Sequence, residues 1–491
     1  MIHQNKTTTP WFVYGVLLFL FATRFLAMVW MPLNDKTEAR YGEIARLMLT
    51  SQNWVTLQQT PGEPFWAKPP LSTWASALSM KMFGVHAWAA RLPSMLCAIG
   101  ILVLMGWVVS RRYSKQYCGY LWLILAGMPY FFINAGVVMT DPVFVFSMTL
   151  CMVAAWLAIS HASRLWGAIF FISLGFGLLA KGPLIGVLVL FPLFLWCALE
   201  RKFHYLWKNL PWVWGSLLTL LVALPWYVLA ELRTPGFLHY FIVGEHIGRF
   251  LESGWSGDKY GFAHAFPLGM IWIFMLGGLF PWLLLVVRDA FKVRGRVVVT
   301  GSQDGWVTYL LCFILTPLIF FSFSRNIIYT YTFTVFPPLA LLVVDGIQRQ
   351  LFPSFTLKRC AWVASSMGTG CLVLSILLLF KPTWVVKSQE NVVRVWQSFH
   401  PHTNLIYWAN EPDFSARFYA RGKVQATRDE KALLQWLQQP IQQYLVVRQD
   451  QLNEISEKLR RRWKAAAQIR VQNKIFILYE IRSRGASKVF V

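Results

Sequence analysis

Apolar runs of about twenty residues recur through most of this chain and restrict its possible folds more than any other feature. A run of that length is what an α-helix needs to cross the hydrocarbon core of a bilayer. Only 14% of the residues are charged, and the polar helix faces of a large soluble protein are missing. We therefore expect an all-α polytopic membrane protein with about 11–13 transmembrane helices. The spans that we predict cover residues 11–31, 87–109, 117–134, 142–160, 165–180, 184–199, 212–230, 267–287, 305–323, 327–344 and 361–381.

Basic residues cluster between these spans, and the clusters set the orientation that we predict. They are Arg111–Arg112, Arg201–Lys202 and Lys292–Arg294–Arg296. Placed in the cytoplasm together with the N-terminus, they satisfy the positive-inside rule, and loops 32–86 and 231–266 fall outside. The net charge of +24 then fits an anionic membrane surface. We expect no nucleic acid partner, because no aromatic-basic nucleic-acid motif occurs.

The first apolar run and the cysteines carry two further expectations. No small-residue cleavage site follows residues 11–31, so we interpret this run as a retained span and not as a signal peptide. The seven cysteines lie in or beside apolar runs, with no CxxC and no Cys/His cluster. This pattern argues against a disulfide framework and against a structural metal.

The last part of the chain, residues 382–491, differs in composition from the membrane part, residues 1–381. The short β-prone runs "NLIYWA", "QYLVVR" and "IFILYEI" alternate with helical patterns at 412–421, 428–437 and 450–462. Strands that alternate with helices predict a small α/β domain on the outer side. It carries no Gly-rich phosphate loop and no catalytic triad, so we expect it to assist the membrane part.

The first outer loop opens with the densely charged stretch "NDKTEARYGEIARLM". Residues 38–49 predict an amphipathic helix along the membrane surface, with Tyr41 on its apolar face. Asp35, Glu38 and Arg40 stand where the span meets this helix and where a lipid head group would arrive, so we assign them to a site. The later charges Glu43 and Arg46 are interpreted as a solvated face with local ion pairs.

The second stretch is "PFWAKPPLSTWASALSM". A residue that precedes proline is restricted to extended conformations, so Lys68 is held stiffly beside aromatic residues, and Pro70 can open the next helix. An apolar stripe on that helix runs from Leu71 to Met82. A lysine at a membrane surface often only snorkels to the interface. The rigid setting of Lys68 favours a placed phosphate ligand instead.

Three further stretches add polar groups at the outer ends of spans. In "MTDP", Asp141 either faces a polar cavity or caps the following helix, with Pro142 at its first position. The loop 233–261 offers Glu245, His246 and Arg249, which either hold a proton or metal or are ordinary hydrogen-bonded loop residues. Finally, "SRNIIYTY" carries Arg325 and Tyr331, and "AKGP" carries Lys181 at the edge of a span.

Together these segments supply cations and carboxylates on one side of the membrane. Cations stabilise a phosphate leaving group, and a carboxylate can accept a proton from an attacking hydroxyl. The pattern therefore predicts an active site for a lipid-linked phosphate substrate.

The motifs also resemble a known family in their order along the chain. "EARYGEIARLM", "PFWAKPPLSTW", "RLPS", "TDP", "AKGP", "PWY", "RTPGF", "VGEHIGRF" and "SRN" are similar to segments of the bacterial aminoarabinose transferases and protein O-mannosyltransferases. Those proteins are membrane glycosyltransferases of the GT-C fold. The resemblance covers about residues 10–345 and implies an inverting transfer. A sugar would leave a polyprenyl (undecaprenyl) phosphate on the periplasmic face of the inner membrane and move to an acceptor.

The resemblance also implies roles for individual residues. The family's first loop carries an Asp-Glu pair where this chain has Thr37-Glu38, so Asp35, two residues earlier, is expected to share the catalytic work with Glu38. Asp141 matches the acidic residue of the second outer loop and completes the catalytic set. The residues expected to bind the donor phosphate are Lys68, Arg40, Arg249 and Arg325. Those expected to bind substrate are Tyr41, Tyr331, Glu245 and His246.

Several alternatives stay open. The expected acceptor is lipid A or another part of lipopolysaccharide, and another glycan or a protein hydroxyl is the alternative. A flippase of polyprenyl-linked sugars is a second class of protein, although inverted repeats and charges deep in the spans are not evident. No metal is assigned, and a divalent ion remains open because the candidate ligands lack a diagnostic spacing.

Overall fold

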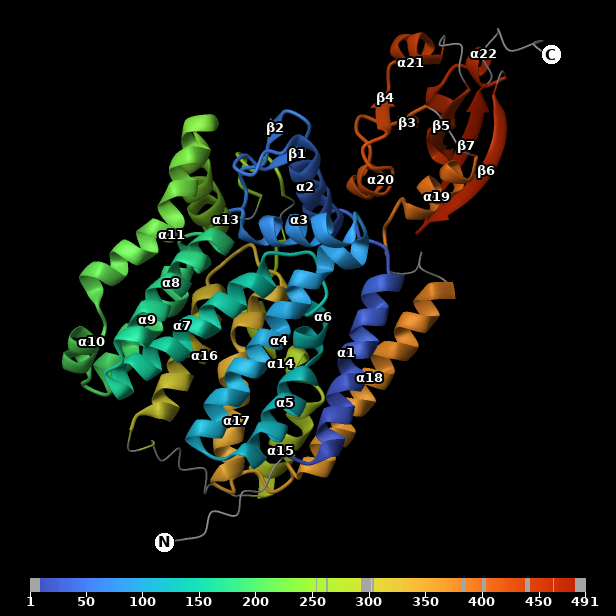
Figure 1. Ribbon diagram of the computed structural model, residues 1–491. Coiled ribbons are helices and arrows are strands. Elements are labelled where there is room, and N and C mark those ends of the chain that lie inside the picture. Colours follow the sequence, from blue (N-terminus) through green and yellow to red (C-terminus); the bar gives the residue numbers. More distant parts are fainter. Residues whose placement is uncertain are drawn as a thin grey trace.

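The computed structural model describes residues 9–252, 254–261, 264–292, 302, 304–380, 386–399, 403–437, 442–461 and 463–481. It consists of a bundle of apolar helices and a smaller sheet-containing part, Glu390–Ile481, which we call the tail domain (Figure 1). The end of the bundle next to the tail domain also carries the first long loop, and we call it the loop end. Helix α1, Trp11–Trp30, begins at the opposite end (Figure 1).

The helices of the bundle follow one another with short connections. They are α1 Trp11–Trp30, α2 Thr37–Ser51, α3 Leu71–Phe83, α4 Ala87–Arg112, α5 Cys118–Ala126, α6 Pro129–Asn134, α7 Asp141–His161, α8 Arg164–Lys181, α9 Leu184–Leu199, α10 Phe203–Asn209, α11 Trp212–Arg233, α12 Phe237–His239, α13 Arg249–Leu251, α14 Met270–Leu279, α15 Trp282–Lys292, α16 Trp306–Ser322, α17 Phe336–Gln348 and α18 Leu357–Phe380. A π-helix, Tyr240–Gly248, and 3₁₀ turns at Lys115–Tyr117 and Tyr329–Thr334 complete it. A two-stranded hairpin, β1 Gln58–Thr60 and β2 Glu63–Pro64, lies in the first loop.

The multi-pass membrane fold predicted from the sequence is confirmed. Among the described residues, α1, α4, α7, α8, α11 and α18 are long and apolar enough to cross a membrane. The predicted span 267–287 is a pair, α14 and α15, bent by 95°. The predicted span 117–134 is divided into α5 and α6, because Pro129 cannot continue a helix. Three other predicted spans, α9, α16 and α17, are shorter apolar helices.

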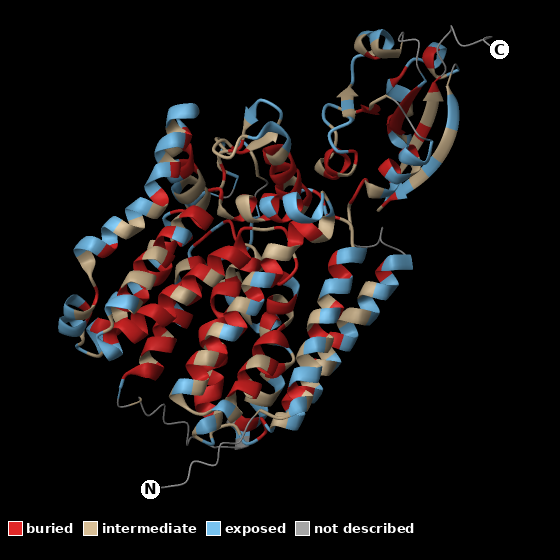
Figure 2. Cartoon of the chain, in the orientation of Figure 1, coloured by how far each residue is buried: buried red, intermediate tan, exposed pale blue. Residues whose placement is uncertain are grey.

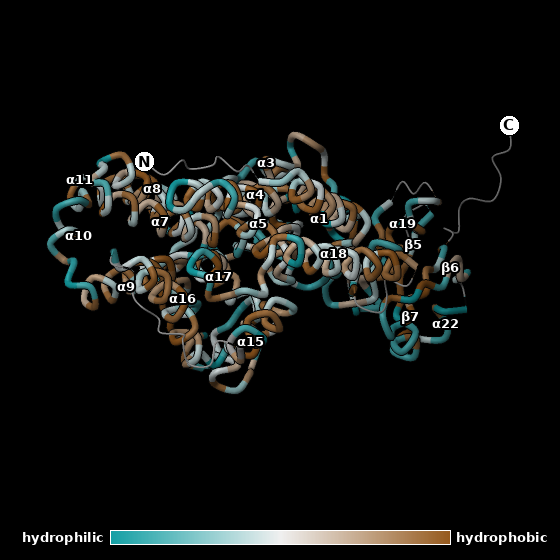
Figure 3. The backbone as a smooth tube through the Cα atoms, turned by 90° about the horizontal axis from the view of Figure 1, so that it is seen from below, coloured by the Kyte–Doolittle hydropathy of each residue, from teal (hydrophilic) through white to brown (hydrophobic). Residues whose placement is uncertain are grey.

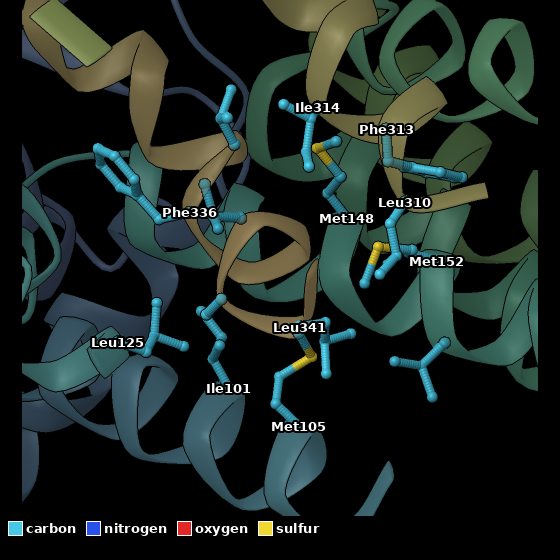
Figure 4. Packing of buried hydrophobic residues seen from close by; sticks show 14 of the residues in the cluster. Ile101, Met105, Leu125, Met148, Met152, Leu310, Phe313, Ile314, Phe336 and Leu341 are labelled. Atoms are coloured by element: carbon cyan, nitrogen blue, oxygen red, sulfur yellow. The ribbon is translucent and has the colours of Figure 1, made fainter. Parts of the chain in front are cut away.

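The core of the bundle lies around α7. Of the span in α7, 83% is buried, against 17% in α18, so α7 is a central helix and α18 faces lipid over most of its surface. Figure 2 shows the same contrast between the inner and outer helices. Met148 and Met152 of α7 pack against Leu310 and Phe313 of α16 (Figure 4). Hydrophobic residues dominate the bundle in Figure 3.

The first loop folds back onto the loop end of the bundle. Helix α2 covers the predicted amphipathic segment, and Tyr41, like the rest of the predicted apolar face, is buried. The charges Glu43 and Arg46 do pair, at 2.6 Å, but the prediction of a solvated face is wrong because both side chains are buried. On α3 the small polar residues Ser72, Ser76 and Ser79 pack inward.

The tail domain is the predicted α/β unit. Its sheet has the order β4-β3-β5-β7-β6, with β3 parallel to β4 and β5, and β7 antiparallel to β5 and β6. Its elements are α19 Glu390–Ser398, β3 Leu405–Trp408, α20 Phe414–Tyr419, β4 Val424–Thr427, α21 Glu430–Leu437, β5 Gln443–Arg448, a 3₁₀ segment Gln449–Glu454, α22 Glu457–Arg460, β6 Lys464–Val471 and β7 Lys474–Ile481. The continuous helix predicted at 450–462 is wrong, since a 3₁₀ segment and a four-residue helix stand there.

The tail domain contacts the bundle through α20, which lies against α2. Gly42 of α2 faces α20, because a Cβ atom there would be in van der Waals contact with the ring of Phe418 at 3.5 Å, and it would also crowd Leu33 of the first loop at 2.9 Å. The Tyr419 hydroxyl accepts a hydrogen bond from the backbone N–H of Leu33 at 2.8 Å. The helix that carries the charged stretch of the first loop is therefore held between bundle and tail domain.

Two of the predicted basic clusters meet at the end of the bundle opposite the tail domain. Arg112 pairs with Asp304 at 2.8 Å, and Lys202 donates to the carbonyl oxygen of Asp304. The third cluster falls mostly outside the described residues, since Arg294 and Arg296 are among those not described. The first two clusters thus lie on one side, as the charge pattern predicts.

Candidate active site

A pocket of about 350 Å³ opens at the loop end, between the start of α9, the end of α16 and the π-helix. One wall is apolar and includes Leu184, Phe250 and Phe320. The polar residues that line the pocket are Lys68, Lys181, Glu245, His246, Arg249, Ser324, Asn326 and Tyr331. They come from four separate parts of the sequence, and five of them are residues that the sequence predicts for the site.

Glu245 is the centre of the first charged group in this pocket. Its carboxylate lies 2.7 Å from Lys68 Nζ and 2.9 Å from Arg249 Nη1. The side chain of Glu245 is only 1% exposed. Burial would raise the pKa of Glu245, but the charges of Lys68 and Arg249 and their hydrogen bonds hold it below its usual value. Glu245 is therefore ionised and shares its charge between two cations that face the pocket.

Local structure explains why these two cations converge. Lys68 stands between Ala67 and Pro69 and donates a second hydrogen bond to the Ala67 carbonyl oxygen at 2.7 Å. Arg249 follows Glu245 by one turn and also lies 3.2 Å from Asp258. Asp258 is fixed by the backbone N–H groups of the turn that follows it. Both cations are thus oriented before any ligand binds.

Lys181 and Asp141 form the second charged group. Lys181 ends α8, Asp141 begins α7, and their charged atoms lie 2.8 Å apart. Lys181 Nζ also lies 4.8 Å from the centre of the Tyr331 ring, which lines the pocket. Thr140 is the N-cap residue of α7 and Pro142 is its second residue, so the alternative in which Asp141 caps the helix and Pro142 takes the first position is wrong. Asp141 instead holds the pocket lysine.

His246 lines the pocket, but its two ring nitrogens face backbone carbonyl oxygens. Nδ1 lies 2.8 Å from the oxygen of Phe241, and Nε2 lies 3.1 Å from that of Lys181. Burial lowers the pKa of His246. The ring thus lies between the π-helix and the end of α8, and its neutral form donates to one of the two carbonyl oxygens. In the described part of the chain, no group of three His, Cys, Asp or Glu side chains is arranged to hold a metal ion.

Glu38 lies in a separate ion pair above the bundle. Its carboxylate accepts two hydrogen bonds of 2.8 Å from Arg91, a residue at the start of α4. Burial would raise the pKa of Glu38, but the charge and hydrogen bonds of Arg91 hold it below its usual value. Arg91 also donates to the carbonyl oxygens of Met28 and Pro32, so it fastens the end of α1.

Asp35 faces the tail domain and not the pocket. Its carboxylate accepts a hydrogen bond of 2.9 Å from the backbone N–H of Ser415 and a second from the Ser415 hydroxyl. Burial and the nearby carboxylate of Asp413 raise the pKa of Asp35 to about 7. The structure therefore does not bring Asp35 together with Lys68 or Asp141.

Three other predicted residues surround the pocket without lining it. Arg40 donates to the carbonyl oxygen of Tyr260 and lies 5.3 Å from the centre of the Phe65 ring. Tyr41 is buried and meets Phe65 edge to face, and burial raises the pKa of its hydroxyl. Arg325 is exposed, and its backbone N–H donates to the Phe250 carbonyl oxygen at 3.2 Å.

The sequence analysis missed roles for Arg91 and Asp258. Arg91 stands four residues inside a predicted span, and a charge in that position signals a buried partner. Asp258 lies in a Gly-rich turn next to Lys259, a setting that gives no comparable signal.

The fold and this pocket define a polytopic membrane protein with a charged, partly apolar site at one end of its helices. Comparisons with known proteins show which proteins it is similar to. A profile of the family described as dolichyl-phosphate-mannose-protein mannosyltransferase matches residues 14–241. The undecaprenyl phosphate-alpha-4-amino-4-deoxy-L-arabinose arabinosyl transferase of Edwardsiella ictaluri is 29% identical over 357 residues, which are 70% of this chain and 60% of that protein. A Pseudomonas fluorescens protein of the same name, numbered 1, is 31% identical over 71% of this chain and 59% of its own length.

A crystal structure of ArnT from Cupriavidus metallidurans bound to undecaprenyl phosphate superposes with a TM-score of 0.76. The superposition covers 95% of this chain and 98% of the ArnT chain at 17% sequence identity, so the two proteins share a fold. The chain aligns with about three fifths of the length of the two sequence relatives. These findings confirm the family resemblance: the chain is related to the aminoarabinose transferases and has their GT-C fold.

Proposed function

We propose that this chain is an inverting glycosyltransferase that moves a sugar from undecaprenyl phosphate to an envelope acceptor. Its active site would face the periplasm from the inner membrane, and its acceptor would be lipid A or another part of lipopolysaccharide. The observation that carries the proposal is the meeting of Lys68, Arg249 and Lys181 in one pocket with an apolar wall. The names of the relatives support the donor and the sugar class.

The donor phosphate would bind where Lys68 and Arg249 already converge. Both cations contact the carboxylate of Glu245, and Arg249 also lies beside Asp258, so a phosphate can bind them without moving either side chain far. When the bond from the anomeric carbon to the phosphate oxygen breaks, negative charge grows on that oxygen. Two fixed cations stabilise this charge as it develops. The apolar wall beside them suits the first isoprene units of the lipid.

The acceptor oxygen would attack the anomeric carbon from the face opposite the phosphate, which inverts the configuration. A phosphate acceptor, as on lipid A, needs little deprotonation. A hydroxyl acceptor must lose a proton, and Asp141 is the carboxylate beside the pocket that we propose as its base. Because Asp35 and Glu38 are bound to Ser415 and Arg91, we propose that they position the first loop.

The matching profile gives one reason to keep a protein acceptor as a second candidate. It is described as a protein mannosyltransferase, and it covers residues 14–241, which include Lys68, Asp141 and Lys181. The same pocket chemistry would serve a serine or threonine hydroxyl, with Asp141 as base.

The test is reconstitution of the purified chain in vesicles with synthetic undecaprenyl phosphate-linked aminoarabinose. Lipid A and an unstructured Ser/Thr-rich peptide are offered separately, with and without divalent cations, and products are weighed by mass spectrometry. We expect one glycosyl increment on lipid A and release of undecaprenyl phosphate. Movement of intact donor across the bilayer with no transfer would instead establish a flippase.

Orientation needs a separate experiment. Glu63 is the exposed first residue of β2, directly after the turn of the β1–β2 hairpin, and it lies near Lys68 in the sequence. In whole cells with a permeable outer membrane, a membrane-impermeant maleimide should label Glu63→Cys and leave the unsubstituted chain nearly unlabelled. Labelling of Glu63→Cys only after the inner membrane is broken would place the site in the cytoplasm.

A further inference from the structure

A second, larger groove lies where the tail domain meets the bundle. Its volume is about 710 Å³, twice that of the pocket described above, and the two share no lining residue. The end of α1, the segment 85–88, α19 and the end of α20 form its walls. We call it the junction groove.

The charges of the junction groove favour an anion. Arg421 and Lys423 are exposed along its wall, two residues apart after α20. Among the described residues that line it, Glu390 is the one acid, and it already pairs with Arg394 at 2.8 Å. Two basic side chains at the surface of one groove match the charge and reach of a phosphate group.

The lower wall of the groove continues onto a surface that faces lipid. Trp30 and Trp88 line the groove, and Trp30 is 38% exposed at the end of α1. Phe25 and Val29, on the same helix, are also exposed, and Phe25 meets Trp88 edge to face at 6.2 Å. Tryptophan at this position is typical of the boundary between lipid head groups and acyl chains. A ligand with an anionic head and apolar tails fits both halves of the site.

We propose that the junction groove binds the head group of an anionic glycerophospholipid of the surrounding membrane, with its acyl chains against α1. Arg421 and Lys423, both exposed on the wall of the groove, hold the phosphate. The lipid thereby fastens the tail domain to the membrane surface beside α2. This inference does not depend on the proposed transferase activity, because the donor phosphate would bind elsewhere, at Lys68 and Arg249.

The test measures lipid binding to the full chain by native mass spectrometry from detergent micelles. Phosphatidylglycerol is compared with zwitterionic phosphatidylcholine and with soluble glycerol phosphate. We expect phosphatidylglycerol to bind, and the double variant Arg421→Ala/Lys423→Ala to bind it at least about tenfold more weakly, since two charge-assisted contacts are lost. The matched control is Arg428→Ala/Lys431→Ala, which removes the same charge from exposed positions outside the groove.

Equal losses in the groove variant and the control variant would show a diffuse surface effect and overturn the proposal. So would equal affinity for the two lipids, or binding of glycerol phosphate as tight as that of the lipid.

Discussion

Lys68 and Arg249 share the carboxylate of Glu245. We expect that removing either cation alone lowers the free energy of unfolding only slightly, and that removing both lowers it strongly. In Lys68→Gln, the buried carboxylate keeps its contact with Arg249 at 2.9 Å, and Lys68 is itself 23% exposed. We expect a loss of about 1 kcal/mol in the free energy of unfolding. Arg249→Gln leaves Glu245 paired with Lys68 and removes the contact with Asp258, so about 1–2 kcal/mol is expected.

The double variant leaves a carboxylate that is 1% exposed without a cation. Breaking a buried pair in this way costs about 3–5 kcal/mol, more than the sum of the two single losses. Adding Glu245→Gln removes the unpaired charge, and the triple variant should regain most of the loss. The measurement is the unfolding midpoint of each purified variant in one detergent, at several denaturant concentrations. Additive losses in the double variant, or no recovery in the triple variant, would refute the shared role of Glu245.

The same lysine gives a functional readout. Lys68→Gln should weaken binding of undecaprenyl phosphate by about ten- to a hundredfold, the value of one charge-assisted contact. Lys259→Gln is the matched control, because Lys259 is exposed, lies over the rings of Trp66 and Tyr240, and does not line the pocket. Equal affinity in both variants would remove Lys68 from the phosphate site.

Three further outcomes follow from other contacts. Asp141→Asn should slow transfer to a hydroxyl acceptor by at least about a hundredfold while donor binding changes little, and a rate near normal in a product assay would exclude Asp141 as base. Gly42→Val should loosen the tail domain, because its Cβ would already touch the ring of Phe418 at 3.5 Å and its two methyl groups would then press on that ring; faster proteolytic release of the tail domain measures this, and unchanged release would contradict it. The pKa of Asp35 is raised from 3.8 to about 7, so the folded state holds a proton that the unfolded state has lost, and stability should fall as pH rises from about 4 to 7. Asp35→Asn should flatten that slope in unfolding midpoints measured across this range, and an unchanged slope would assign it to other groups.

Local patterns carried most of what the sequence could predict. Apolar runs located the spans, and the prolines around Lys68 located an extended, rigid lysine that does reach the pocket. Lys68 comes from a segment with a strong local signal, and it lies together with Glu245 and Arg249, for which the sequence left an ordinary role in the loop open. Broken spans were harder to predict. An apolar run of about twenty residues has the same composition whether it forms one helix or two, as in the predicted span that contains α5 and α6.

The predictions that the structure does not bear out concern residues whose surroundings come from distant parts of the sequence. Asp35 looks like a free carboxylate at a membrane surface, but its partner is Ser415, 380 residues away. Glu43 and Arg46 look solvated because nothing local shows that this part of the chain will be covered. Strand β6 was not predicted for a different reason: most of its residues are partly or fully exposed, and its pattern lacks a hydrophobic face. Burial at a domain junction leaves little trace in a single sequence.

Helix α2 explains why so many charges gather early in the chain. One part of it sends Glu38 to Arg91 and buries Tyr41 beside Phe65, close to the pocket. Another part presents Gly42 to the tail domain, while Asp35, just before the helix, binds Ser415. A helix fixed on both sides cannot shift against the bundle unless the tail domain shifts with it. Any ligand that fastens the tail domain to the membrane would therefore also fix the first loop over the pocket. A lipid in the junction groove would in this way affect the proposed reaction without contacting the pocket.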